Sequence, residues 1–231
     1  MNPPAGFWRR YAAYSLDIAL LALLALPLLW SRLAAGADEL DAGLERLQWR
    51  LWEMFDASLA HPDTSPLALA NQWAADPVLR AGMESLVLSG TVLTLQTLAV
   101  FCGLAAVWFI AGEASPWQAS PGKRAFGLRV TDRDGVRPGL GRVMLRFLAG
   151  APSWLLLNLG HAMAAWTPGK RALHDYLAGT RVELAPGAAP AMPRGARRWL
   201  YAQAAAFAAT VGFIGLRYAQ LLWEVAEGGL P

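Results

Sequence analysis

The sequence has little charge and a single cysteine. Asp, Glu, Lys and Arg make up 16% of its 231 residues, whereas soluble domains usually carry about 25%. Cys102 stands alone inside an apolar segment, which excludes an intramolecular disulfide framework and a metal site made of several cysteines. The shortage of charge indicates that lipid, rather than water, surrounds much of the chain.

Familiar catalytic patterns are also missing. The sequence contains no H-E-x-x-H zinc motif, no G-x-S-x-G nucleophile elbow and no G-x-x-x-x-G-K-[ST] phosphate loop. Its three histidines, His61, His161 and His174, are too scattered in the sequence to predict a metal site. We therefore expect no enzyme, no cofactor and no metal. Basic residues lie beside the apolar segments and not on one soluble face, so we expect no nucleic acid partner either.

Three apolar segments are long enough to cross a bilayer, which takes roughly 20 residues. They are residues 11–30, 86–111 and 199–225. The first could also be read as a signal peptide because Arg9 and Arg10 precede it, but Asp17 lies inside it and it is longer than such signals. We interpret all three as transmembrane helices.

The charges of the loops predict the orientation, because Lys and Arg are retained on the cytoplasmic side. Residues 31–84 hold nine acids and four arginines, whereas residues 112–142 hold six basic residues and three acids. We predict a multi-pass protein of the bacterial inner membrane, with residues 31–84 outside and the N-terminus in the cytoplasm.

A fourth apolar segment, residues 143–166, is unlike a simple span because it contains Arg146, Pro152, Asn158 and His161. The next segment is basic and reads as cytoplasmic, so a full crossing would place it on the wrong side. A re-entrant or broken hairpin that turns near Pro152 removes this conflict, and we prefer it to a full span. Irregular backbone at membrane depth is tolerated beside protein or a water-filled cavity.

A short repeat flanks that segment. Trp117-Gln-Ala-Ser-Pro-Gly-Lys-Arg-Ala recurs as Trp166-Thr-Pro-Gly-Lys-Arg-Ala, and each copy precedes a run rich in β-forming residues, at residues 126–132 and 179–184. Asp134-Gly135 follows the first run as a turn signal. Two such runs on one membrane face could pair, which predicts a small cytoplasmic β element.

The outer loop is expected to be helical. Leucines 40, 44, 47 and 51 recur at helical spacing, which predicts an amphipathic helix lying on the outer surface. Ser65-Pro66 and Asp76-Pro77 each place a capping residue before a proline. These two pairs predict two further short helices.

Buried charge marks the candidate site. Asp17 lies deep in the first span, seven residues after Arg10 and on the same helix face. A carboxylate at that depth costs about 2.5–3.5 kcal/mol on insertion scales, so it needs protein or water around it. It could serve transport or only form a structural ion pair, and Arg10 could instead reach lipid headgroups. Arg146 could contact Asp17 if the hairpin packs on the first span.

The motifs Arg10-Tyr-Ala-Ala-Tyr-Ser-Leu-Asp17, Pro121-Gly-Lys-Arg and Leu173-His-Asp175 resemble those of the bacterial RDD family, which is named for one arginine and two aspartates. The resemblance covers residues 7–184 and implies that Arg10, Asp17 and Asp175 are the family's three residues. It also implies a membrane protein for which transport of small ligands, including cation/proton antiport, is suggested. The long outer loop and the last span depart from the family.

Beside these three residues we select Arg146 and His174, which precedes Asp175 and titrates near neutral pH. Asp175 could equally cap a helix or bond to Lys170 and Arg171. The basic side chains of the two Pro-Gly-Lys-Arg copies are candidates for anionic lipid headgroups or another anion. These are Lys123, Arg124, Lys170 and Arg171.

We thus expect an all-α polytopic membrane protein with three full transmembrane helices, one broken hairpin and a small cytoplasmic β element. Its predicted parts are a membrane domain over residues 7–184 with residues 31–84 inserted as a helical outer loop, a basic linker over residues 185–198, and an added span over residues 199–225. The leading hypothesis is a transporter or cation/proton exchanger, as a homo-oligomer in a membrane with anionic lipids. The alternative is a non-catalytic scaffold or an accessory subunit of a membrane complex.

Overall fold

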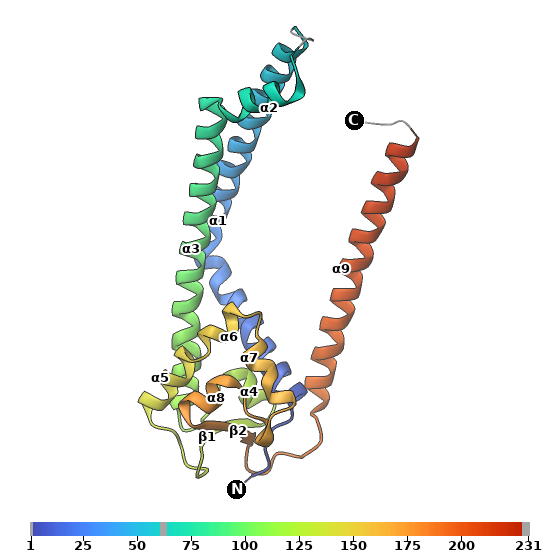
Figure 1. Ribbon diagram of the computed structural model, residues 1–231. Helices are drawn as coiled ribbons and strands as arrows, with labels where there is room; N and C mark the ends of the chain where they lie inside the picture. The colour runs from blue at the N-terminus through green and yellow to red at the C-terminus, as the bar shows by residue number, and fades with distance from the viewer. Residues whose placement is uncertain (1, 61–63, 228–231) are drawn as a thin grey trace. The chain divides into compact units, whose positions relative to one another are not determined.

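The computed structural model describes residues 2–60 and 64–227, and they are mostly helical (Figure 1). Three helices are long and apolar enough to cross a membrane, namely α1 (Phe7–Leu59), α3 (Pro77–Ala114) and α9 (Arg194–Ala226). They contain the three predicted spans. The helix α9 begins at Arg194, so the end of the predicted linker is already helical.

Residues 21–105 form one compact unit. Within it the segments of α1 and α3 pack antiparallel to each other. Leucines of one helix lie on glycines of the other. A Cβ atom on Gly36 would lie 2.5 Å from Leu93 Cδ2, and one on Gly82 would lie 2.6 Å from Leu47 Cδ2. Glycine therefore allows this close approach of the two backbones.

The outer loop differs from its prediction in two places. The amphipathic stretch after the first span is not a separate surface helix, because α1 continues without a break through Leu59. Ser65 caps the short helix α2 (Pro66–Ala74) as predicted, with its hydroxyl accepting from Ala68 N at 3.3 Å. Asp76 accepts from Leu79 N at 2.7 Å, but the helix that it starts is the long α3.

The second unit comprises residues 1–20 and 106–231. The predicted β element is confirmed here: β1 (Leu128–Asp132) pairs antiparallel with β2 (Thr180–Leu184), with Leu128 opposite Leu184. Their buried side chains form a core with small residues of α1 and the start of α9, and Phe126 closes it. The turn predicted at Asp134-Gly135 is also present, since Gly135 N donates to Asp132 O.

Short helices fill the rest of this unit (Figure 1). In chain order they are α4 (Pro121–Ala125), α5 (Leu140–Leu148), α6 (Ala151–Leu155), α7 (Leu159–Ala162), the 3-10 turns η1 (Met163–Ala165) and η2 (Pro168–Lys170), and α8 (Leu173–Ala178). The segment from Leu140 to Ala165 is bent by 112°, as a broken helix requires. The bend does not lie at Pro152, which is in the first turn of α6, but at Leu157 and Asn158, whose φ angles are +51° and +63°.

Candidate functional site

Asp17 on α1 is fully buried and holds the start of α4. Its carboxylate accepts hydrogen bonds from Gly122 N at 2.7 Å, Ser120 Oγ at 2.6 Å and Trp108 Nε1 at 2.9 Å. Acceptors are stabilising at a helix start because its first N–H groups have no partner within the helix. The predicted contact between Asp17 and Arg146 is therefore wrong. Every bond that Asp17 makes in the described chain goes to α3 or to the α4 segment.

Asp175 on α8 is another fully buried carboxylate. It pairs with Arg10 Nη2 at 2.6 Å and with Arg146, and it accepts from Ala172 N at 2.9 Å. Burial alone would raise the pKa of Asp175, but Arg10 and Arg146 together outweigh it and hold this pKa well below its usual range. Capping of α8 is confirmed, whereas the basic partners are Arg10 and Arg146 and not Lys170 and Arg171.

Glu113 near the end of α3 is a third buried carboxylate, which sequence reasoning did not select. It pairs with Lys123 Nζ at 2.8 Å and with Arg146 Nε at 2.9 Å. Arg146 also donates to Thr180 Oγ1 at 2.9 Å, so this one guanidinium joins α3, α8 and β2. A lone acid at the end of a long apolar segment was the signal that could have identified Glu113.

Two histidines that are distant in sequence meet in the fold. The ring centroids of His161 and His174 lie 4.7 Å apart, and the ring of Tyr14 lies 4.9 Å from His161. Burial, together with Arg146, holds the pKa of His174 well below its usual range, so this ring is neutral at pH 7. No group of three metal-ligating side chains is present among the residues that the structure describes.

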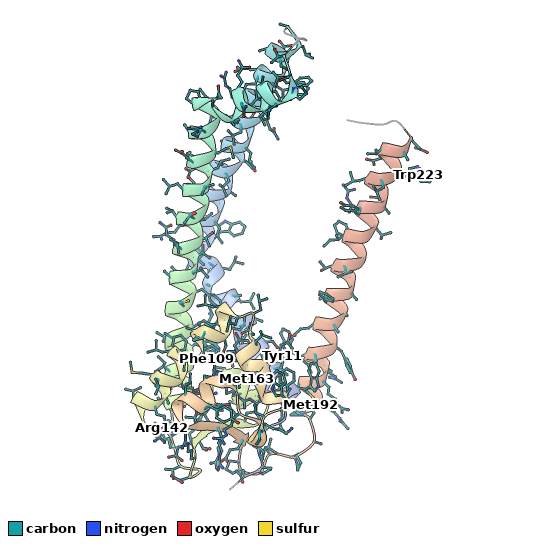
Figure 2. All side chains as sticks on the ribbon, in the orientation of Figure 1. Tyr11, Phe109, Arg142, Met163, Met192 and Trp223 are labelled. Carbon is teal, nitrogen blue, oxygen red and sulfur yellow. The ribbon has the colours of Figure 1, made fainter. Side chains whose placement is uncertain are left out.

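These groups surround a cavity of about 90 Å³. Three cationic side chains, Arg10, Lys123 and Arg146, line it together with Glu113 and the two histidines. Aromatic side chains form most of the remaining wall, beside Leu128, Val143 and Gly150, and two of the aromatic residues, Tyr11 and Phe109, are labelled in Figure 2. The bend of the broken helix borders it, since Tyr14 Oη donates to Asn158 Oδ1 at 3.4 Å.

Comparison with known proteins shows the family of the chain. The sequence profile of the RDD family matches residues 4–179. The chain belongs to the RDD family. An uncharacterized protein of Bacillus subtilis (strain 168), YxaI, is 25% identical over 185 residues, which cover 79% of this chain and 98% of YxaI. No solved structure matches the chain.

The match to the RDD family includes all three residues taken from the resemblance. The fold brings two of them together, since Arg10 pairs directly with Asp175, while Asp17 lies apart from that pair and binds the start of α4. The region of the match ends before β2, so Thr180 and the whole of α9 lie beyond it.

The basic residues of the RDD protein's two Pro-Gly-Lys-Arg copies differ in their surroundings. Lys123 is not free to meet lipid, because it is largely buried against Glu113. Arg124 stacks on Trp117 at 3.8 Å, and Arg171 stacks on Tyr176 at 4.5 Å. Lys170 is exposed. Contact with anionic lipid stays a prediction for Arg124, Lys170 and Arg171.

Proposed function

We propose that this RDD protein spans the bacterial inner membrane, binds a small ligand in the cavity and takes part in its transport. The supporting observation is the cavity itself, which places three cations, a carboxylate and two histidines beside a broken helix. Charged groups near membrane depth are costly and commonly mark ligand pathways. Interrupted helices surround the ligand sites of many transporters.

The membrane assignment rests on family membership and on three long apolar helices. The acidic loop at residues 31–84 and the basic loop at residues 112–142 support an N-terminus in the cytoplasm. Three spans are few to enclose a pathway, so we expect a homo-oligomer. A transport-active species that is strictly monomeric in nanodiscs would contradict that expectation.

Cation/proton exchange is one form of this proposal. The geometry favours Glu113 over Asp17 as the exchanging carboxylate. An exchanging carboxylate must release one ion before it accepts the other. The oxygens of both carboxylates are bound: Asp17 is held by the start of α4 and by Trp108, away from the cavity, whereas Glu113 lines the cavity and pairs there with Lys123 and Arg146. We therefore assign the exchanging role to Glu113, with Asp17 as a structural residue.

The test is charge and proton movement in proteoliposomes after concentration jumps of sodium, potassium or lithium chloride, followed by choline salts of small anions. The unaltered protein is compared with Glu113→Gln, Arg146→Gln and the control Arg142→Gln. Arg142 lies one turn before Arg146 on α5, and its partner is Asp132 on the surface. Movement that only the cavity variants abolish supports transport, and cation-dependent proton flux lost in Glu113→Gln supports exchange.

A scaffold or accessory subunit is the second candidate. It is favoured by one observation, the pairing of Glu113 and Asp175 with three cations in a network that ties α1, α3, α5 and α8 together. Such a network can serve only to fix the packing of these helices. Absence of movement with every salt, in correctly folded protein, would contradict transport and favour this role.

A further inference from the structure

We propose that the cavity binds an amphiphile with one anionic headgroup, such as a carboxylate, sulfonate or phosphate ester, attached to an apolar chain or ring. This inference rests on the proposed function, since it names the chemical class of the ligand that the same cavity takes. Three independent features of the cavity carry it: its charge, its unpaired ring nitrogens and its aromatic wall.

The charge of the cavity favours an anion. Arg10, Lys123 and Arg146 line it, and Glu113 is the one carboxylate among its described lining residues. Asp175 pairs with two of these cations, Arg10 and Arg146, but does not itself line the cavity. Each cation has a carboxylate partner, but three cations against two carboxylates leave this cluster with a net charge of +1. A buried net charge is costly, and a bound anion would neutralise it.

Asp17 does not supply that missing negative charge. It is not among the residues that line the cavity, and its carboxylate is already bound by Gly122 N, Ser120 Oγ and Trp108 Nε1. Asp17 is linked to the cavity only indirectly among the described residues, through Ser120 Oγ, which donates to Asp17 and lies 3.4 Å from Lys123 Nζ.

Two ring nitrogens in the cavity wall lack partners. His161 Nδ1 and His174 Nδ1 are buried and make no hydrogen bond within residues 2–60 and 64–227. His174 as a whole is only 6% exposed. Buried polar atoms are almost always hydrogen-bonded, so this pair is suited to a headgroup that both carries oxygen atoms and reaches past the arginines.

The rest of the wall is suited to an apolar group. Aromatic rings from α1, α3, α5 and α6 line the cavity beside the cations, and they are Phe7, Tyr11, Tyr14, Phe109, Phe147 and Trp154. Burying apolar surface against such rings stabilises a complex by roughly 25 cal/mol per Å². A bare inorganic anion would leave this contribution unused, which is why we infer an amphiphile.

The test is equilibrium binding of octanesulfonate to the full chain in nanodiscs of neutral phosphatidylcholine, with empty nanodiscs as the reference. Octanesulfonate keeps its charge at every usable pH. Octyltrimethylammonium has a similar apolar chain with the opposite charge, and inorganic phosphate has the charge without the chain. We expect saturable binding of one octanesulfonate per chain, with both comparison ions at least about tenfold weaker, because each lacks one of the two interactions.

Three variants connect this binding to the cavity. Arg146→Gln should weaken octanesulfonate at least about tenfold through the loss of a charged hydrogen-bond donor, whereas Arg142→Gln on the same helix should leave its affinity unchanged. If Arg146→Gln fails to fold, His161→Phe keeps the aromatic stacking and removes the ring nitrogens. It should weaken binding by roughly threefold to tenfold.

The outcomes separate this inference from the proposed function. Octanesulfonate binding without any transport would sustain the inference and contradict transport. Transport of a cation without octanesulfonate binding would do the reverse. Equal binding of octyltrimethylammonium or of phosphate would overturn the amphiphile, the first by showing that charge is irrelevant and the second by showing that the chain is. Competition by phosphatidylglycerol in the nanodisc would identify a lipid headgroup as the source of the anion; its absence would identify a water-soluble amphiphile.

Discussion

The two Pro-Gly-Lys-Arg copies share a sequence and differ in structure. In the first copy Pro121 begins the helix α4, Gly122 N donates to Asp17, and Lys123 is buried against Glu113. In the second copy the same letters form a 3-10 turn in which Gly169 has φ +70°. Lys170 in that turn is exposed.

The difference teaches that partners outside the tetrapeptide decide its conformation. Asp17 is available to the first copy and accepts the N–H groups of a helix start. Among the described residues, no carboxylate accepts from the N–H groups of the second copy; instead the carbonyl oxygen of Lys170 accepts from Arg10 Nη1 at 2.6 Å. The first copy thus depends on a charge in α1, and the second depends on backbone conformation.

The largest expected effect comes from adding a methyl group to Gly122 in the first copy. The same change at Gly169 in the second copy is the matched comparison. In Gly122→Ala the new Cβ would collide with Ala13 O and lie 2.8 Å from Asp17 Cγ. We expect a loss of about 4 kcal/mol or failure to fold, from overpacking and a lost charged hydrogen bond. In Gly169→Ala the nearest atom is 3.7 Å away, so only the left-handed backbone costs, about 1 kcal/mol. Unfolding by SDS in mixed micelles measures the loss of stability in both variants. Equal losses would show that the two copies do not differ in how tightly their glycines are packed.

Removing the charge that holds the first copy should have the next largest effect. Asp17→Asn keeps the size of the side chain but cannot accept three hydrogen bonds as an ionised carboxylate does, so we expect about 3 kcal/mol less stability. The control is Asp134→Asn on the exposed turn, which should change stability by less than about 0.5 kcal/mol. Full stability of Asp17→Asn would show that Asp17 is not the residue that holds α4.

The region after the second copy should instead be sensitive to acid. Because the pKa of His174 is held well below 6.5 in the folded state, the unfolded chain binds more protons as the pH falls below 6.5. Stability should therefore be complete well above that value and decrease as the pH falls below it, by up to about 1.4 kcal/mol for each pH unit. Asp175 adds a similar loss only below its ordinary pKa of 3.8.

His174→Gln tests the assignment of this acid sensitivity. Melting temperatures of the unaltered protein and of His174→Gln, measured in nanodiscs between pH 7 and 5, should differ in slope, with the variant flatter. Parallel slopes would mean that other groups cause the pH dependence.

Much of the fold could be predicted from the sequence. Apolar length identified the three long helices that could cross a membrane, and β-forming residues after each repeat copy identified the two strands that pair. The location of the bend was missed because it depends on left-handed backbone at Leu157 and Asn158, for which neither residue type gives a strong local signal. Helix α1 continues past the predicted span, where leucines pack on facing glycines of α1 and α3, a contact between segments that are distant in sequence.

The site was less predictable because its residues meet only through folding. The pairing of Arg10 with Asp175 joins the start of α1 to α8, and Arg146 binds Glu113 instead of Asp17. Sequence spacing placed Arg10 and Asp17 on one helix face, but it could not show which charges from other helices would reach each of them. For Glu113 the sequence offered one signal, its position as a lone acid at the end of a long apolar segment, and it did not show which cations would pair with this acid.

The most direct test of the whole account is the affinity of octanesulfonate for Lys123→Gln and Lys170→Gln, measured side by side in neutral nanodiscs. The two lysines occupy the same position in the two copies, but only Lys123 lines the cavity. We predict that Lys123→Gln weakens binding by about tenfold, the usual contribution of one charged contact, and that Lys170→Gln changes it by less than about twofold. Equal weakening by both variants would show that the anion binds to general basic surface and not in the cavity, and would contradict the account.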